Sequence, residues 1–400
     1  MRKRCILKRT FAPVGQGAFY TERFYFFLCT NTKEFNTVYD CGALYISKSK
    51  KKLVNDLIQK RSVDILFISH FDYDHVSLIP TLVSAAKNIK LIVLPLLHEK
   101  EKKILISLYR VLEKELNYSF GFVADLIEKP EKTFGDDSTI IRVKPWEENR
   151  REEEGKEINL DNIPPGTQME IDSGSKFLKE NFWLYVPYNF YYEENAKRLE
   201  FMLKKAGINV DKLTNDENYL ESLIKDKRYR RKIRKIYNSL EGDINSNSLV
   251  VYSGPFKVHN NKVYFFYRSN SIFRFCPSSK HYKNTSQNTA DYLSGCLYRA
   301  GCLYTGDMNL KDKKFNLKKI FSKYWKVIGT IQVPHHGSKN SFNPKNFKKC
   351  VFAPISTGKN QYGHPSIETL QKLISLNTCP ILVTESVGFR QKWEMLIRIQ

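Results

Sequence analysis

The sequence predicts an α/β protein, because strand and helix patterns alternate along two long stretches of the chain. In the first stretch, the apolar runs "VDILFIS" and "IKLIVLP" are separated by segments with helical spacing. Runs of the same kind return between residues 247 and 386. Alternation of this type is typical of layered folds in which helices cover sheets.

The expected elements follow from apolar runs, turn residues and helical spacing. In the first part we expect strands at 21–30, 35–42, 63–69 and 89–95, with helices at 48–60, after His75 and at 99–116. In the last part we expect strands at 247–254, 262–268, 302–307, 327–333, 350–356 and 380–386, with helices at 316–323 and 367–375. The polar stretch 268–296 is expected to be a loop insertion.

Composition and charge narrow the class of protein. A hydrophobic fraction of 42% fits a folded chain, no apolar run is long enough to cross a bilayer, and the basic start lacks a signal-peptide core. The net charge of +23 favours a polyanionic partner, nucleic acid before acidic lipid. The alternative is a Lys-rich surface from a biased genome. Eight cysteines without a C-x-x-C pair predict a reducing cytoplasm and argue against a zinc finger.

We expect residues 1–400 to form a single domain. Residues 130–244 differ from the rest in composition and are expected to be a charged, helical insertion within it. The aromatic strand "FWLYVPYNFYY" is followed by charged helices. Within 219–240, apolar residues recur at helical spacing, and six basic residues fill most of the other faces. These basic residues are Arg228, Arg230, Arg231, Lys232, Arg234 and Lys235. They form either the solvated outer face of an amphipathic helix or a surface that contacts phosphates.

The stretch "SHFDYDH" concentrates acid and imidazole at the end of an apolar strand. In an extended chain His70 and Asp72 point the same way and can hold one ion together. Asp74 and His75 follow where the chain turns into a helix, so they face a second position nearby. Because clustered carboxylates are costly to bury without a cation, two metal ions about 3.5–4 Å apart are the simplest interpretation.

Further ligands are expected at the ends of later strands. Asp307 ends "YTGD" and could bridge two ions, and His364 lies in "YGHPS" before a helix. His335 and His336 are adjacent in "VPHHGS", so their side chains point in opposite directions and only one is expected to bind metal. Each residue alone could be a capping Asp or a loop His. Their shared position at strand ends, where α/β sheets gather ligands, predicts the site.

These motifs resemble the metallo-β-lactamase superfamily, and within it the hydrolase domain of ComEC-type DNA-uptake competence proteins. The resemblance is carried, in the family's order, by "VGQG" (14–17), "YDCG" (39–42), "SHFDYDH" (69–75), "NSNSLVV" (245–251), "LYTGD" (303–307), "VPHHGS" (333–338) and "YGHPS" (362–366). It covers residues 1 to about 125 and about 244 to 400. It implies an αββα sandwich with two metal ions at one edge of the sheets, interrupted by a helical, basic insertion.

The resemblance also implies a role for each site residue. Asp40 would be a supporting carboxylate behind the metal loop. One ion would be held by His70, Asp72 and preferably His336, the other by Asp74, His75 and His364, with Asp307 between them. His335 would contact the substrate or leaving group. The superfamily's commonest pattern has His where Asp72 stands, and the harder carboxylate shifts the preference from zinc toward manganese or magnesium, with zinc still open.

We therefore expect a two-metal hydrolase, and the basic charge favours a nuclease that cleaves DNA first and RNA second, with Asp74 orienting the water. A phosphodiesterase or esterase for a small molecule is the enzymatic alternative. A non-catalytic nucleic-acid-binding component that keeps metal for structure is the other. We expect no membrane association. From the resemblance, relatives of this kind belong to bacterial, including antiviral, defence or to mobile-element loci.

Overall fold

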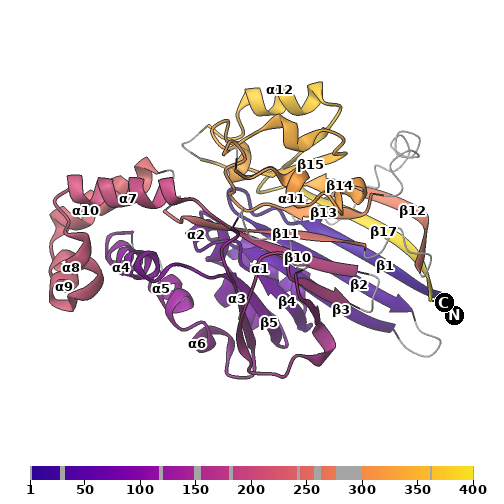
Figure 1. Ribbon diagram of the computed structural model, residues 1–400, viewed down its shortest axis with the longest axis horizontal. Helices are drawn as coiled ribbons and strands as arrows, with labels where there is room; N and C mark the ends of the chain where they lie inside the picture. Colours follow the sequence, from indigo (N-terminus) through magenta and orange to yellow (C-terminus); the bar gives the residue numbers. More distant parts are fainter. Residues whose placement is uncertain are drawn as a thin grey trace.

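Two β-sheets lie face to face, and helices cover the outer face of each (Figure 1). The structure is a computed structural model, which describes residues 2–27, 32–116, 120–147, 155–179, 183–240, 244–255, 263–275, 299–312, 314–360 and 363–399. The predicted α/β class is confirmed, and the layers are consistent with an αββα sandwich.

The first sheet has nine strands within the described residues, in the order β12-β17-β1-β2-β3-β4-β5-β6-β8. Their bounds are β1 (Arg2–Phe11), β2 (Phe19–Phe27), β3 (Thr32–Cys41), β4 (Val63–Phe67), β5 (Ile89–Pro95), β6 (Thr139–Val143), β8 (Gln168–Ile171), β12 (Val263–Phe275) and β17 (Gly388–Ile399). Strands β3 to β8 are parallel, and the other pairs are antiparallel. Strands β4, β5 and β6 at the centre of the parallel part are short, largely apolar and mostly buried, as expected for strands that are covered on both faces.

The second sheet has eight strands in the same part of the chain, in the order β16-β15-β14-β13-β11-β10-β9-β7. Their bounds are β7 (Glu157–Asn159), β9 (Lys176–Lys179), β10 (Trp183–Tyr191), β11 (Asn247–Pro255), β13 (Gly301–Tyr304), β14 (Ile328–Ile331), β15 (Phe352–Ser356) and β16 (Cys379–Val383). Strands β13 to β16 are parallel. Their carboxyl ends carry the loops in which site residues were predicted.

Helices form the outer layers. Those that follow the strands of the first sheet are α1 (Lys48–Ile58), α2 (Tyr73–Val76), α3 (Ile79–Ala85), α4 (Glu99–Leu116), α5 (Phe120–Glu128) and α6 (Glu131–Phe134). A helical layer packs against α4 and comprises α7 (Glu193–Lys205), α8 (Val210–Asn215), α9 (Glu217–Lys225) and α10 (Lys227–Ser239). The second sheet is covered by α11 (Leu317–Ile320) and α12 (Ile367–Ser375).

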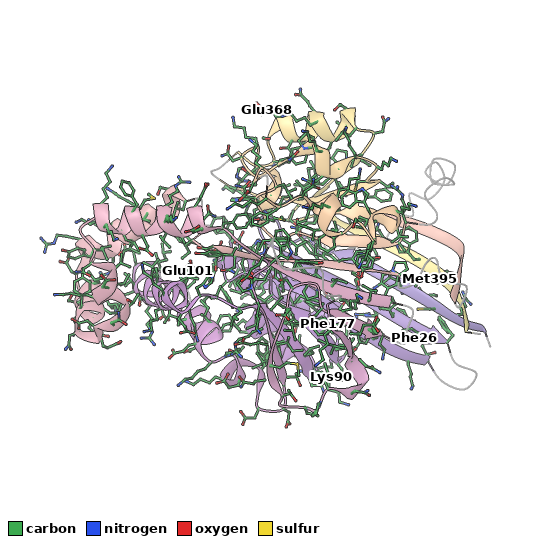
Figure 2. The ribbon with its side chains drawn as sticks, in the orientation of Figure 1. Phe26, Lys90, Glu101, Phe177, Glu368 and Met395 are labelled. Carbon is green, nitrogen blue, oxygen red and sulfur yellow. The ribbon has the colours of Figure 1, made fainter. Side chains whose placement is uncertain are left out.

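Three buried apolar clusters correspond to these layers. One lies between the first sheet and its helices, one between the two sheets, and one between the second sheet and α11 and α12. The middle cluster is aromatic and includes Phe177, Trp183 and Trp393. Figure 2 shows Glu368 and Lys90 at opposite outer edges of the molecule, with Phe177 between them.

A buried ion pair in the first sheet accepts hydrogen bonds from the second sheet and so links the two sheets. Arg9 on β1 donates from Nε to Oε1 of Glu22 on β2 (2.7 Å), and both side chains are buried. The Glu22 carboxylate also accepts hydrogen bonds from Tyr185 (3.1 Å), Ser253 (2.6 Å) and Tyr304 (2.9 Å), which belong to the second sheet. Burial opposes the charged guanidinium, yet the Glu22 carboxylate raises the pKa of Arg9 above its ordinary value.

Some parts of the chain differ from the sequence-based expectation. The prediction of a loop at 268–296 is wrong for residues 268–275, because they belong to β12 at the edge of the first sheet. Residues 276–296 lie outside the described residues. An edge strand needs only one pairing partner, so a polar composition does not prevent it from forming. Strands β1 and β17 were not expected and pair with each other. Among the described residues, no helix combines the length and apolarity needed to cross a membrane.

The expected insertion, 130–244, contains more than helices. Strands β6 and β8 extend the first sheet, and β7, β9 and β10 extend the second. Its helical part is the segment from α7 to α10, which begins at Glu193 and ends at Ser239. The strands of this segment are therefore integral to the sandwich, whereas its helices form an additional layer.

Glu22→Gln should destabilise the fold strongly, because it leaves the Arg9 charge buried without its partner. The expected loss in the free energy of unfolding is about 3–5 kcal/mol, measured by urea denaturation. Asp56→Asn breaks the exposed pair between Lys52 and Asp56 (2.6 Å) and should cost no more than about 0.5 kcal/mol. Similar losses for the two variants would contradict the role of the buried pair.

Candidate metal centre

The loop after β4 is held by the carboxylate of Asp40, which lies at the end of β3. Asp40 is fully buried, and its φ of +54° turns the chain so that its side chain faces this loop. Its Oδ1 accepts from the backbone N–H of Ser69 (2.7 Å), and its Oδ2 accepts from Oγ of Ser69 (2.6 Å) and from Nδ1 of His75 (2.8 Å). With Nδ1 of His75 occupied, Nε2 is the atom presented to the site.

Two glycines allow the loops of the site to approach one another. A Cβ atom on Gly42 would lie 2.4 Å from the backbone of His75, so the end of β3 packs directly on α2 only because this residue has no side chain. Gly306 has a φ of +53°, and a Cβ there would lie 2.8 Å from Cβ of Ser69. These close contacts explain the glycine that follows Asp40 by two residues in "YDCG" and the glycine that precedes Asp307 in "LYTGD".

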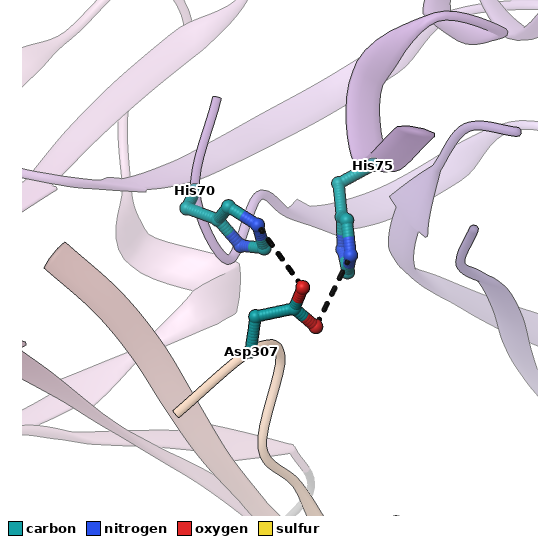
Figure 3. A group of neighbouring side chains, drawn as sticks. All are labelled: His70, His75 and Asp307. Atoms are coloured by element: carbon teal, nitrogen blue, oxygen red, sulfur yellow. Dashed lines mark ion pairs between the residues drawn. The ribbon is translucent and has the colours of Figure 1, made fainter. Parts of the chain in front are cut away.

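Three side chains from the two sheets converge on one point. Nε2 of His75 lies 3.3 Å from Oδ1 of Asp307, and Nε2 of His70 lies 3.9 Å from Oδ2 of the same carboxylate (Figure 3). Both imidazole nitrogens are buried, and neither has a hydrogen-bond partner in the described part of the chain. Two orphaned acceptor or donor atoms aimed at one carboxylate are costly unless a ligand occupies the space between them.

A second group shares a member with the first. Asp74, His75 and His336 also place one ligand atom each within 4.8 Å of one another. Oδ2 of Asp74 lies 3.0 Å from Nε2 of His336, whose Nδ1 lies 3.0 Å from the carbonyl oxygen of Ser356. The single free nitrogen of His75 can bind only one ion. A second ion near His70 would therefore need another ligand.

Asp72 is the nearest additional ligand for that ion. Its Oδ2 lies 3.4 Å from Nε2 of His70. Its Oδ1 is held from behind, because it accepts from Nδ2 of Asn245 (2.6 Å) and lies 3.1 Å from the hydroxyl of Tyr109 on α4. Asn245 begins the "NSNSLVV" motif, for which no role in the site was predicted, and Tyr109 had no recognisable signal in its helix.

The two adjacent histidines occupy a turn in which both have left-handed backbone angles, with φ of +48° for His335 and +52° for His336. Such conformations are uncommon for residues other than glycine and cluster at functional sites. The turn sends His336 toward Asp74, whereas His335 is half-buried and its backbone N–H donates to Oδ1 of Asp307 (3.2 Å).

The predicted ligands are thus brought together with a grouping that differs from the expected one. His336 lies with Asp74 and His75, instead of with His70 and Asp72. His364 is in neither group, and its ring lies 5.8 Å from that of His335.

Charges in the site depend strongly on one another. Burial by itself would lower the pKa of His75, but the carboxylates of Asp307 and Asp74 raise it well above its ordinary value. The pKa of His336 is raised in the same way against the effect of burial. Conversely, burial would raise the pKa of Asp307, but His75 and His336 hold it well below its usual range, and the pKa of Asp74 is also lowered. Without metal, protons on the histidines supply the positive charge that the carboxylates need.

A pocket of about 200 Å³ opens over this cluster. His70, Asp307 and His335 contribute to its lining, whereas Asp74 does not. Its other walls come from the helical layer, from the start of β11 and from the loops after β13 and β14. The remaining lining residues are Tyr192, Asn195, Arg198, Ser239, Leu240, Asn245, Asn247, Ser248, Asn309, Ser338, Asn340 and Ser341. The participation of α7 and α10 in these walls was not expected from the sequence.

A family comparison agrees with the fold and the ligand groups. Residues 24–162 match the metallo-beta-lactamase superfamily model. The match includes β3, β4, α2 and β5, and hence the loop with His70, Asp72, Asp74 and His75. No curated protein and no solved structure matches the chain. The matched region gives no support for the ComEC-type branch in particular.

The metallo-beta-lactamase match and the side chains together support a metal-dependent hydrolase. Members of this superfamily typically bind divalent metals, often zinc, and the orphaned Nε2 atoms of His70 and His75 fit such a group. In the second group a carboxylate and two imidazoles provide the mixed oxygen and nitrogen set that zinc and manganese accept. The match thus supports divalent metal as the cofactor class.

Variants of the ligands should separate direct binding from support. Asp40→Asn, which weakens the hydrogen bond behind His75, should lower metal affinity by about 10–100-fold. Asp307→Asn should lower it further, because it removes a ligand. Metal per chain is measured by mass spectrometry after dialysis against Mn²⁺. His364→Ala serves as the control and should retain wild-type metal content; loss of metal from this variant would contradict the grouping.

The free energy of unfolding of the metal-free protein should depend on pH through both the histidines and the carboxylates of the site. A raised histidine pKa contributes stability below the ordinary value of about 6.5, and this contribution is lost as pH rises through the raised values of His75 and His336. The lowered carboxylate pKa values of Asp74 and Asp307 stabilise the fold above their ordinary value, and this stability is lost as pH falls through the lowered values.

Metal replaces the protons, so the increase in Tm caused by Mn²⁺ should grow as pH rises above about 6.5. Thermal unfolding of metal-free and metal-loaded protein across this range measures it. An increase in Tm that stays constant with pH would contradict the exchange of protons for metal.

Proposed function

We propose that the protein is a metal-dependent nuclease that hydrolyses phosphodiester bonds in DNA, and secondarily RNA. The observation that carries the proposal is the convergence of Nε2 of His70 and of His75 on the Asp307 carboxylate, beside a polar pocket that His70 and Asp307 line. Neither nitrogen has a hydrogen-bond partner within the described residues. The net charge of +23 supports a polyanionic substrate over a neutral ester or lactam.

The residues of the site are suited to distinct roles. Divalent ions bound by the two ligand groups would supply hydroxide near neutral pH and neutralise charge on a phosphoryl oxygen. Asp40 and Asp72 hold the ligand loop through buried hydrogen bonds. His335 lines the pocket beside Asp307, where it can give a proton to the leaving oxygen. Asp74, which we expected to orient water, is instead 3.0 Å from His336 and fits better as a ligand.

The basic helix α10 gives weaker support than its sequence suggests. Acidic side chains outside the run neutralise part of it: Arg228 pairs with Asp226 (2.8 Å), and Arg230 and Arg234 pair with Glu115 (3.3 and 3.8 Å). The Lys232 Nζ donates to a backbone carbonyl oxygen. Arg231 and Lys235 are exposed and have no ion-pair partner in the described chain, so these two are the best candidates for contact with a nucleic-acid backbone.

A small-molecule phosphodiesterase is the second candidate. The pocket is small, and α7 and α10 wall it on the side of the helical layer. A pocket of about 200 Å³ suits a single nucleotide or a compact ester better than a long duplex. Under the first candidate the same pocket would receive one nucleotide unit of a single strand or of a frayed end.

One experiment separates the two candidates. Purified protein is incubated with single- and double-stranded DNA and RNA, and with bis(p-nitrophenyl) phosphate, under Mn²⁺, Mg²⁺ or Zn²⁺. A nuclease degrades at least one polymer with a rate that falls as salt rises, whereas a small-molecule enzyme turns over only the chromogenic diester. Asp307→Asn should be inactive in either case. Hydrolysis that persists in this variant, or none in the wild type under any ion, would refute the proposal.

His335→Asn should distinguish proton donation from metal binding. Asparagine tolerates the left-handed backbone angle at this position, so the turn should persist. We expect cleavage of nucleic acid to slow by about 100-fold or more, with metal content unchanged. The effect on bis(p-nitrophenyl) phosphate should be much smaller, because p-nitrophenolate leaves without a proton. Equal losses on both substrates would argue against a proton-donor role.

A further inference from the structure

The start of α7 is tied to the loop that carries Asp307. The backbone N–H of Tyr192, the residue before α7, donates to the carbonyl oxygen of Ser246 (2.7 Å). The hydroxyl of the buried Tyr192 accepts from the backbone N–H of Asn309 (3.0 Å), two residues after Asp307. The first turns of α7 therefore have a fixed position relative to the metal ligands.

Two side chains of α7 line the pocket from this position. Asn195 and Arg198 are three residues apart, so they lie on the same face of the helix, and both line the pocket together with His70 and Asp307. Arg198 is exposed to solvent and has no ion pair or hydrogen bond within the described residues. Three other arginines of the helical layer, in contrast, are paired with carboxylates.

The remaining lining of the pocket leaves Arg198 available for a ligand. Among the described residues that line it, Asp307 is the one acidic residue, and its carboxylate faces His70 and His75. The other polar walls are mainly neutral amides and hydroxyls. Arginine presents a planar fork of donors that matches two oxygens of a phosphate, and such charge-assisted pairs are stronger than neutral hydrogen bonds.

We propose that Arg198 binds the non-bridging oxygens of a phosphodiester whose scissile bond lies over the metal ligands. The inference rests on the proposed function, since it assigns the substrate's anionic group to a specific residue of that pocket. It makes Arg198 a specificity-determining residue, which selects phosphodiesters over neutral esters. It also gives α7, a helix that lies outside the family match, a direct role in substrate recognition.

The test compares Arg198→Gln and Arg198→Lys with a control from the same helix. Lys205→Gln removes one exposed positive charge from α7 without touching the pocket lining. For bis(p-nitrophenyl) phosphate, Arg198→Gln should lower kcat/KM by about 10–100-fold, and the lysine variant by less. For the neutral ester p-nitrophenyl acetate, Arg198→Gln should change kcat/KM by less than about twofold. The control should match the wild type on both substrates.

Binding provides a readout that does not need turnover. Calorimetric titration of metal-free protein with bis(p-nitrophenyl) phosphate should give a Kd at least about tenfold weaker for Arg198→Gln than for the wild type or Lys205→Gln. Wild-type behaviour of Arg198→Gln in both assays, or equal losses on the charged and neutral substrates, would overturn the inference and leave the nuclease proposal standing. Arg198-dependent binding without hydrolysis under any metal would refute the proposed function alone.

Discussion

The carboxylate of Asp40 is the constraint on which the rest of the site depends. It is fully buried, and its two oxygens accept from both polar groups of Ser69 and from His75. A buried carboxylate needs such partners, because an unpaired charge in the interior is costly. The same hydrogen bonds that satisfy Asp40 set the path of the loop and the orientation of the His75 ring, so the stability of this loop and the geometry of the site depend on the same contacts.

Much of the architecture follows from local sequence patterns. The apolar run of β4 and the residues after it were readable because parallel buried strands have a distinctive composition and end at ligand loops. Strand β1 was missed because Arg9, one of its inward residues, is charged, and its burial depends on Glu22, a neighbour that only the paired sheet reveals. Charged helices after the aromatic strand could be predicted, but neither their number nor the surface against which they pack.

In the site, too, some features could be predicted from the local sequence and others depend on residues far apart in the chain. The residue types and the strand ends were enough to predict His70, Asp74, His75 and Asp307 as neighbours. The grouping of His336 with Asp74 depends on two successive left-handed residues, which the sequence of an HHG turn does not specify. Supports such as Tyr109 come from helices far along the chain, so only the folded structure associates them with the ligands.

The histidine turn has a consequence for how this protein can diverge. Since His335 and His336 share one short backbone segment, a backbone change that moves the first side chain also moves the second, so their positions are linked. Asn195 and Arg198 of α7 also line the pocket, but neither belongs to a ligand group found among the described residues. New substrate preferences should therefore arise from substitutions in α7 and α10, while the residues of the two ligand groups stay the same.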